Sequence, residues 1–409
     1  MIRAARVLGE GEGVSVYLVG GPVRDLILGR PTADLDLAVA GDAVAFAKGL
    51  AAHLETRATV HPRFGTATLI LPDGLRLDVA AARREVYPHP AALPQVEPGT
   101  IWEDLFRRDF SINAMALRVA PRGGGLLDPF GGVKDLTGGL LRALHPHSYR
   151  DDPTRIFRGA RYGARYRLRF SARDRRRIRS VLAETVLRRL SKDRLFRELT
   201  LVLGEPAPEA ALKILQNLGV LTAIDAALAL APGAVTHMRR VRRAWQRLDR
   251  LAIAARPPLW RLHLLVLLLS VPPRVRRRVA TRLGVHGSAL DAVMRELSDL
   301  PLLEKRLEDR RLGASRLRHL LDRVSVDLRI LLLASQARRV RDRVERYLTC
   351  LASVKPALTG QDLRKFGFPP GPAYRRILDL LLEGRLEGCL KSRDDEINFV
   401  QQRFGRRKL

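Results

Sequence analysis

Hydrophobic residues in the first part of the chain fall into short blocks with strand and helix patterns. Residues 14–20 are apolar and β-prone and end in a glycine pair, which predicts a buried strand entering a tight turn. The pattern over 23–28 indicates a helix, and 35–39 indicates a second strand. Asp42 is placed to cap a further helix that runs to residue 54.

The following blocks predict a hairpin and a loop. Residues 66–71 and 75–80 are strand-like and flank Pro72-Asp73-Gly74, a turn sequence, so we expect them to pair. Residues 88–100 are rich in proline and glycine, which favours a loop. Residues 109–117 return to an ordered pattern.

Beyond about residue 140 the pattern changes to long apolar segments with helical periodicity. Residues 262–271 are the most apolar run, about half the length of a membrane span, so we expect a buried helix and no membrane partner. The pattern therefore predicts an α+β protein with a mixed sheet and helices first and an all-helical remainder. Glycine- and proline-rich breaks separate the helical segments near 204–208, 231–233, 256–258 and 356–372.

The net charge of the chain indicates what kind of partner it binds. The 409 residues carry a formal net charge of +30, which favours a polyanion because each neutralised phosphate releases condensed counterions. The alternative is that all proteins of the source organism are rich in arginine, in which case the positive charge does not indicate a partner. The only cysteines, Cys350 and Cys389, provide no disulfide framework or metal cluster, which indicates a reducing compartment. The N-terminal residues show no signal-peptide pattern, so we expect a cytoplasmic protein.

The first candidate site lies between the first two predicted strands. Gly20 and Gly21 allow the backbone to approach a polyphosphate, and the next helix offers it free N–H groups. Arg24, one turn into that helix, can add a charge-assisted contact. Asp34 and Asp36 stand two apart on a strand and face the same way, and paired carboxylates suit Mg²⁺. A glycine turn beside an exposed polar strand end is the alternative.

Asp78 interrupts the apolar second strand of the predicted hairpin, where a charge is costly unless it is paired or bound to a metal. It would be the third carboxylate of a two-metal site for phosphoryl displacement. We therefore predict Asp34, Asp36 and Asp78 as catalytic metal ligands. The alternative for Asp78 is an edge charge paired with Arg76 or Arg83.

Residues 103–116 place many charges beside an apolar segment. Arg108 is the candidate here for a triphosphate contact. Asp109 and Asn113 can brace this part of the chain internally, and we include both among the predicted nucleotide-binding residues.

The segment from Asp151 to Arg161 has the pattern of a helix start. Asp152 is placed at the cap and Pro153 at the first helical position. Arg155, Arg158 and Arg161 then recur every third residue along the helix, which gives one basic face.

Three motifs together resemble a known family. They are residues 18–25 with Asp34-x-Asp36, residues 107–116, and Asp151-Asp-Pro-Thr-Arg155 running into Arg158 and Arg161. The chain resembles the class II tRNA nucleotidyltransferases, which are the bacterial and eukaryotic CCA-adding enzymes, and the related bacterial poly(A) polymerases. The likeness is specific over about residues 14–165. It is weak elsewhere, with short matches at 360–363 and 370–372.

The resemblance implies a division of the chain. We expect a polymerase-β-like nucleotidyltransferase head over 1–140, a neck with a base-reading helix over 141–205, a helical body over 206–345 and a helical tail over 346–409.

Base selection can be argued from Asp152 and Arg155. Cytosine and adenine present an amino donor beside a ring-nitrogen acceptor, which a carboxylate and a guanidinium match, whereas guanine and uracil present the reverse. In the family, the matching Asp and Arg select CTP and ATP in this way. Arg158 and Arg161 would support the pocket or the phosphates. Asp151, also in the predicted nucleotide site, stands where many relatives have Glu. The alternative is that Asp152 only caps the helix and pairs with Arg155.

A dense basic stretch surrounds this motif. Residues 150–179 hold twelve Arg against three Asp. A solvated helix face is the usual interpretation of such a run, but its position beside the base-reading residues favours contact with an RNA backbone.

The resemblance implies a Mg²⁺-dependent enzyme with a two-metal site. It would transfer C and/or A from CTP and ATP to the 3′ end of tRNA and release pyrophosphate. A-only addition and poly(A) synthesis on RNA 3′ ends would use the same site, and an RNA-binding protein with a decayed site is the non-enzymatic alternative. Residues 87–99 correspond to a flexible loop that family members use in changing from C to A, which argues against a C-only enzyme.

Overall fold

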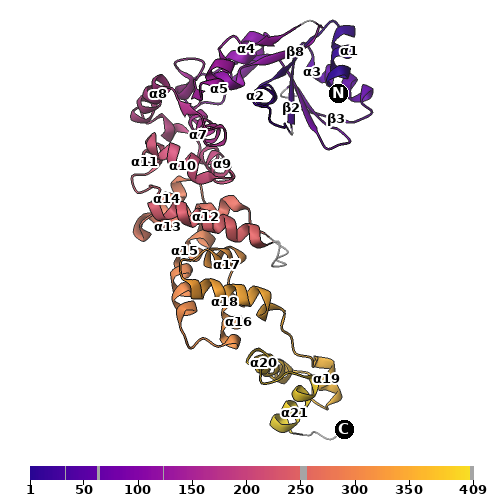
Figure 1. The fold of residues 1–409 in the computed structure, drawn as a ribbon, viewed down its shortest axis with the longest axis vertical. Helices are drawn as coiled ribbons and strands as arrows, with labels where there is room; N and C mark the ends of the chain where they lie inside the picture. The colour runs from indigo at the N-terminus through magenta and orange to yellow at the C-terminus, as the bar shows by residue number, and fades with distance from the viewer. Residues whose placement is uncertain (33, 62–64, 123, 249–255, 406–409) are drawn as a thin grey trace. The chain divides into compact units, whose positions relative to one another are not determined.

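The computed structural model describes residues 1–32, 34–61, 65–122, 124–248 and 256–405. The chain separates into two compact units, residues 1–229 with 282–284 and residues 230–281 with 285–409. Figure 1 shows the sheet in the first part of the chain and helices alone in the last part. This arrangement confirms the predicted α+β fold, and the finer division into four parts stays a prediction.

The first unit contains a seven-stranded mixed sheet with the strand order β3-β4-β5-β2-β1-β8-β9 (Figure 1). Neighbouring strands β2 and β5 pair in parallel, and the other neighbours pair antiparallel. The strands are β1 (Ser15–Val19), β2 (Asp34–Ala40), β3 (Ala58–His61), β4 (Thr66–Ile70), β5 (Arg76–Ala81), β8 (Ala116–Ala120) and β9 (Leu126–Leu127).

Helices cover both faces of this sheet, because successive side chains of a strand point to opposite sides. On one face, α1 (Ile2–Gly11) and α3 (Ala43–His53) form a core with Leu18 and Leu37. On the other face, α4 (Ile101–Phe106) packs against the alternate strand residues, such as Tyr17 and Ala38. The predicted cap of α3 is confirmed, since Asp42 Oδ1 accepts from the backbone N–H groups of residues 44 and 45 at 2.9 and 3.0 Å.

The predicted hairpin is confirmed by the antiparallel pairing of β4 and β5. The predicted loop over 88–100 is wrong at its end, where β7 (Gln95–Pro98) pairs with β6 (Arg83–Val86). Arg84 and Glu97 are opposite each other in this ladder, and their Nη2 and Oε2 atoms lie 2.6 Å apart. Opposite charges at facing positions stabilise a strand pair, which a proline-rich composition does not reveal.

The remainder of the first unit is mainly helical. A short parallel pair, β10 (Leu140–Leu141) and β11 (Arg169–Phe170), lies beside these helices. The helices are α2 (Gly21–Ile27), α5 (Gly132–Thr137), α6 (Ser148–Asp151), α7 (Thr154–Tyr166), α8 (Ala172–Ala183), α9 (Lys192–Leu203), α10 (Pro208–Asn217) and α11 (Val220–Ile224).

The second unit contains the later helices. Its apolar helix α13 (Leu259–Leu269) is buried, as predicted. Across the described residues, no helix combines the length and apolarity needed to cross a membrane. The other helices are α12 (Pro232–Arg247), α14 (Pro273–Arg282), α15 (Gly287–Glu308), α16 (Ala314–Asp322), α17 (Val326–Leu333), α18 (Arg338–Thr349), α19 (Gly360–Lys365), α20 (Pro372–Leu386) and α21 (Arg393–Phe404).

Candidate active site

The turn between β1 and α2 brings the backbone close to Arg108. Gly20 has φ of +73°, a conformation that favours glycine. A Cβ at this position would lie 2.4 Å from Arg108 Nη1, so a side chain would displace the guanidinium. Gly21 begins α2, and its position leaves the first N–H groups of that helix available to an anion.

We expect Gly20→Ala to destabilise the protein by about 1–3 kcal/mol, because alanine would hold a strained backbone conformation. The same substitution should lower nucleotide affinity, because Arg108 must move. Chemical denaturation and equilibrium nucleotide binding measure the two effects. Gly29→Ala is a suitable control, because Gly29 also has positive φ but its Cβ would meet open space. Equal nucleotide affinities for the two variants would contradict this account.

Three carboxylates share one face of the sheet. Asp34 and Asp36 are two positions apart on β2, so their side chains point to the same face. Asp36 is in register with Asp78 on the parallel strand β5. Burial raises the pKa of Asp36, and the nearby charges of Asp78 and Asp34 raise it further, although Arg108 opposes them. Asp36 therefore lacks full compensation for its negative charge, which a cation would supply.

Asp78 also has protein partners. Its Oδ1 accepts from Thr68 Oγ1 at 2.6 Å, and its Oδ2 lies 3.0 Å from Arg76 Nη2. Both members of the ion pair are partly exposed, and such pairs contribute little to stability. Arg76 can therefore be displaced from Asp78 at small cost.

No three Asp, Glu, His or Cys side chains of the described residues converge closely enough to hold a metal ion. The donor types nevertheless fit Mg²⁺, because the three carboxylates lie on one face of the sheet and one of them, Asp36, lines a cavity that can hold phosphates.

A cavity of about 560 Å³ lies in the first unit, and it contains Asp36 and the base-reading candidates in its wall. Of the residues predicted from the sequence, Gly20, Asp34, Asp78 and Asp151 are outside this lining. The lining residues are Gly21, Arg24, Asp36, Glu85, Tyr87, Pro94, Arg107, Arg108, Asp109, Asn113, Asp152, Arg155, Arg158, Arg161, Tyr162 and Arg165.

A smaller cavity of about 260 Å³ is lined by Asp36, Asp78 and Arg108, among others. The buried Asp104 fixes Arg108 here, since Asp104 Oδ2 accepts from Arg108 Nη2 at 2.8 Å. Its Oδ1 accepts from Arg107 Nη2 at 2.7 Å. Burial alone would raise the pKa of Asp104, but the two guanidiniums lower it, so it stays ionised. Arg108 is thus held in place beside the carboxylate face.

Arg24 is more constrained than the sequence suggested. Its Nη1 donates to Asn113 Oδ1 and its Nη2 to Tyr166 Oη, both at 2.6 Å. Its guanidinium also lies 4.3 Å from the centre of the Tyr166 ring, a cation–π distance. Asn113 Nδ2 in turn donates to Asp109 Oδ1 at 3.0 Å. Arg24, Asn113 and Asp109 therefore brace the cavity wall as well as lining it.

The start of α7 agrees with the predicted cap. Asp152 is extended and its Oδ1 accepts from the backbone N–H of Thr154 at 3.1 Å, while Pro153 has helical φ of −63°. The one-residue difference in where the helix begins is within normal assignment variation. Asp152 Oδ2 accepts from Arg158 Nη2 at 3.2 Å, and Arg158 Nε donates to Asp109 Oδ2 at 3.1 Å.

The predicted basic face of α7 is divided among acidic partners. Burial opposes the charge of Arg158, but Asp109 and Asp152 raise its pKa. Arg161 instead binds Glu205, its Nε lying 2.8 Å from Glu205 Oε1.

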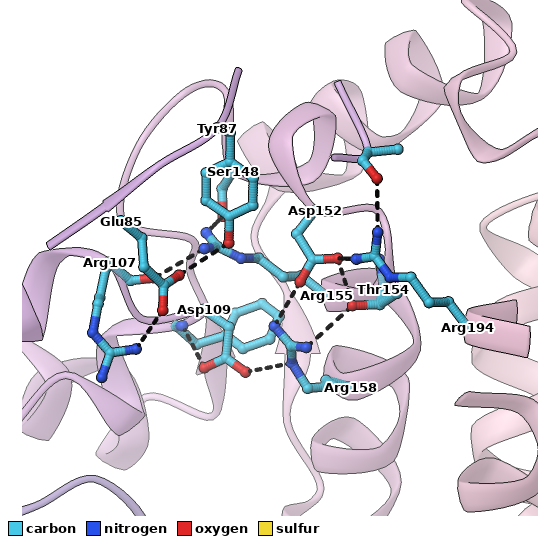
Figure 2. A network of polar contacts seen from close by, with 12 residues as sticks. Glu85, Tyr87, Arg107, Asp109, Ser148, Asp152, Thr154, Arg155, Arg158 and Arg194 are labelled. Atoms are coloured by element: carbon cyan, nitrogen blue, oxygen red, sulfur yellow. Dashed lines mark hydrogen bonds and ion pairs between the residues drawn. The ribbon is translucent and has the colours of Figure 1, made fainter. Parts of the chain in front are cut away.

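Arg155 is 2% exposed and points away from the predicted partner (Figure 2). Its Nη1 donates to Ser148 Oγ at 2.5 Å, and its Nη2 donates to the backbone carbonyl of Arg107 at 2.9 Å. The backbone N–H of Arg155 donates to the carbonyl of Asp152 at 3.1 Å, but among the described residues no hydrogen bond joins the Arg155 guanidinium to the Asp152 carboxylate. Asp152 therefore caps the helix, but the pairing of its carboxylate with the Arg155 guanidinium, which the alternative also requires, is not formed among the described residues.

His145 lies beside this guanidinium, with its Nε2 3.3 Å from Arg155 Nη1. Burial, followed by the charge of Arg155, lowers the pKa of His145 to about 4. The imidazole is therefore neutral at pH 7 and can accept a hydrogen bond. Asp151 is nearby at the end of α6, with Oδ2 3.8 Å from His145 Nδ1.

Several cavity residues were not among the predicted site residues. Glu85 Oε1 accepts from Arg107 Nη1 at 2.9 Å, and Glu85 Oε2 accepts from Tyr87 Oη at 3.1 Å (Figure 2). Burial raises the pKa of Tyr87 to about 12, so its hydroxyl stays protonated and can donate. Tyr162 and Arg165 also line the cavity. They belong to α7, and only the helical spacing from Arg158 could have indicated them.

Comparison with known proteins places this site in context. Residues 16–142 match the Poly A polymerase head domain family. An A-adding tRNA nucleotidyltransferase of Halalkalibacterium halodurans is 32% identical over 97% of this chain and 90% of that protein. A CC-adding tRNA nucleotidyltransferase of Deinococcus radiodurans is 34% identical over 97% and 91%. An A-adding enzyme of Geobacter sulfurreducens is 35% identical over 98% of this chain, which spans only 46% of that relative.

Solved structures agree with these relatives. A CCA-adding enzyme in an apo form has a TM-score of 0.83 at 30% identity, with 98% of this chain and 94% of that chain covered. With the same coverage and 28% identity, a CCA-adding enzyme in complex with ATP has a TM-score of 0.80. The Thermotoga maritima enzyme complexed with tRNA has a TM-score of 0.77, again with this identity and coverage. The chain therefore belongs to the class II tRNA nucleotidyltransferase family.

Proposed function

We propose that this protein is a Mg²⁺-dependent nucleotidyltransferase that adds C and/or A from CTP and ATP to the 3′ end of tRNA. The observation that carries the proposal is that Asp36, Arg108, Asp152 and Arg155 line one cavity. A carboxylate suited to a metal ion, a phosphate ligand and the base-reading candidates therefore meet where one nucleotide can bind. We place this activity in the cytoplasm, because a chain with only two cysteines indicates a reducing compartment.

The reaction is attack of the RNA 3′-hydroxyl on the α-phosphorus of the nucleoside triphosphate, with pyrophosphate as the leaving group. Asp34, Asp36 and Asp78 would hold Mg²⁺, with Asp78 exchanging its contact to Arg76. When bound, Mg²⁺ lowers the pKa of the attacking hydroxyl and neutralises charge on the pyrophosphate. Arg108 and the N–H groups at the start of α2 orient the triphosphate, so most of the catalysis is positioning and electrostatic stabilisation.

Base selection is assigned to Asp152 and Arg155. The Asp152 carboxylate is kept ionised, because Arg158 and the hydrogen bond from Thr154 lower its pKa against the effect of burial. An ionised carboxylate accepts from the amino group of cytosine or adenine. Arg155 would exchange its contact with Ser148 for the ring nitrogen of the base. Guanine and uracil would meet the opposite donors and acceptors and be rejected.

Arginines of the second unit support an RNA partner. Arg240, Arg243, Arg247 and Arg341 line a cleft of about 480 Å³, with Asp342 and Glu345 as the acidic residues in its lining. We assign this cleft to phosphates of the tRNA backbone. The dense arginine stretch at 150–179 in the first unit is a second place for such contacts.

A-only addition is the second candidate, because two of the relatives are A-adding enzymes. One assay separates the candidates: purified protein, Mg²⁺ and each labelled nucleoside triphosphate are incubated with tRNA lacking CCA, tRNA ending in CC, tRNA ending in CCA, and an unrelated RNA. CCA synthesis predicts extension of the first two tRNAs, and A-only addition predicts extension of the second alone. Long A tails on the unrelated RNA would indicate poly(A) synthesis, and no extension of any RNA would contradict the proposed activity.

A further inference from the structure

Arg194, in the first turn of α9, connects two parts of the cavity wall that are far apart in the sequence. Its Nη2 donates to Asp152 Oδ1 at 3.0 Å, and its Nη1 donates to the backbone carbonyl of Ala91 at 2.7 Å. Figure 2 shows the Arg194 guanidinium directed at the Asp152 carboxylate. Its side chain is 24% exposed, so solvent screens these contacts only in part. One arginine therefore bridges a candidate base-reading carboxylate and the segment before β7.

At one end of this bridge, Ala91 has a backbone conformation that its surroundings hold in place. Ala91 is buried and has φ of +62°, which is unusual for a residue with a side chain. Its N–H is shared between the carbonyl oxygens of Arg150 and Asp151, both at 3.1 Å. Such a conformation persists only where its surroundings hold it, and the bond from Arg194 supplies part of that support. Residues 87 and 94, on either side of Ala91, both line the cavity.

At the other end of the bridge, the hydrogen bonds to Asp152 determine which of its two carboxylate oxygens is available to a ligand. Asp152 Oδ1 accepts from three donors: the Thr154 N–H, Thr154 Oγ1 and Arg194. Asp152 Oδ2 accepts from Arg158 alone among the described residues. Because Oδ1 is fully occupied and Oδ2 is not, Oδ2 is the oxygen that can accept from an incoming amino group.

We infer that Arg194 is a positioning residue for base selection. Its hydrogen bond to Oδ1 fixes the plane of the Asp152 carboxylate. Its hydrogen bond to Ala91 fixes the position of residues 87–94, which form part of the cavity wall, relative to that carboxylate. This inference rests on the proposed function only for the identity of the ligand. The bridge itself consists of the two hydrogen bonds of Arg194 and does not depend on which ligand binds.

The test compares Arg194→Met and Arg194→Lys with Arg197→Met. Arg197 is an exposed arginine on the same helix, so its loss should leave the cavity intact. Two readouts are independent of catalysis: hydrogen exchange at the Ala91 amide in the free protein, and equilibrium binding of ATP and GTP. Turnover with a tRNA ending in CC is the third.

We expect Arg194→Met to speed exchange at Ala91 and to reduce the preference for ATP over GTP by about tenfold, within the range for one well-placed polar pair. Arg194→Lys keeps the charge but cannot span both acceptors equally, so its effect should be intermediate. Arg197→Met should match the wild type in both readouts. Unchanged exchange or an unchanged binding preference in a folded Arg194→Met protein would overturn the inference.

The outcomes also separate this inference from the proposed function. If the wild type prefers ATP in binding but extends no RNA, the proposed activity fails and the binding data still decide the role of Arg194. If the wild type binds ATP and GTP equally, the role of Arg194 in base selection is overturned. Should Arg194→Met fail to fold, the Lys variant provides the same comparison.

Discussion

Asp36→Asn is expected to reduce nucleotide addition by at least about 10²–10³-fold, the loss typical of removing one group that stabilises charge in the transition state. Asn keeps the shape of the side chain but removes the charge that would bind Mg²⁺. Burial and the neighbouring carboxylates raise the pKa of Asp36 despite Arg108, so a cation bound there would stabilise the ionised form. Steady-state addition of labelled nucleotide to tRNA measures the effect.

Two controls make this result specific. The melting temperature and tRNA affinity of Asp36→Asn should stay close to those of the wild type, because the carboxylate is only partly buried and is not in the core. Asp73→Asn, in the hairpin turn, removes a negative charge from the same unit and should leave addition unchanged. Wild-type rates for Asp36→Asn would refute the metal-binding role.

The second large effect is on base choice. We expect Asp152→Ala to lower the ratio of kcat/KM for ATP over GTP by about 10–100-fold, since a well-placed pair of polar contacts discriminates by about 1–3 kcal/mol. Most of the change should come from slower use of CTP and ATP, because the amino group loses its acceptor. Single-nucleotide kinetics with all four triphosphates provide the measurement.

Asp152 also holds two arginines, so stability must be measured beside specificity. Its loss leaves Arg158 and Arg194 with one acceptor fewer each, and unpaired buried charges are destabilising. Asp152→Asn retains the shape of the side chain and one oxygen acceptor, so it is the milder variant. Asp193→Ala, at an exposed position on α9, is the matched control and should preserve base choice. A folded Asp152→Ala that still rejects GTP as the wild type does would show that another group reads the base.

Four of the seven strands described in the sheet could be predicted, because local signals agreed there. The strands β1, β2, β4 and β5 are short apolar blocks, and turn residues mark their ends. The strand β7 was missed, because its pairing with β6 depends on cross-strand contacts such as Arg84 with Glu97, and no turn sequence marks the connection between the two strands. Proline and glycine around it favoured a loop in any local interpretation.

The sequence indicated which residues belong to the site, but not which groups their side chains contact. The motifs supplied Arg24 and Arg155, yet Tyr166 and Ser148, which hold their guanidiniums, carry no motif of their own. A buried guanidinium must fill its donors with whatever the tertiary fold brings near it, including backbone carbonyls. Such networks follow from packing between elements, which hydrophobic periodicity does not encode.

The most direct test of the account is the sequence of the 3′ ends that the enzyme makes. Wild-type protein is incubated with Mg²⁺, equal amounts of all four nucleoside triphosphates, and tRNAs that lack CCA or end in CC, and the products are sequenced without any nucleic-acid template present. We expect that only C and A are added, that the tRNA ending in CC receives A, and that Asp36→Asn adds nucleotides at least about 10²-fold more slowly. Frequent G or U in the new 3′ ends, or addition by Asp36→Asn as fast as by the wild type, would contradict the account.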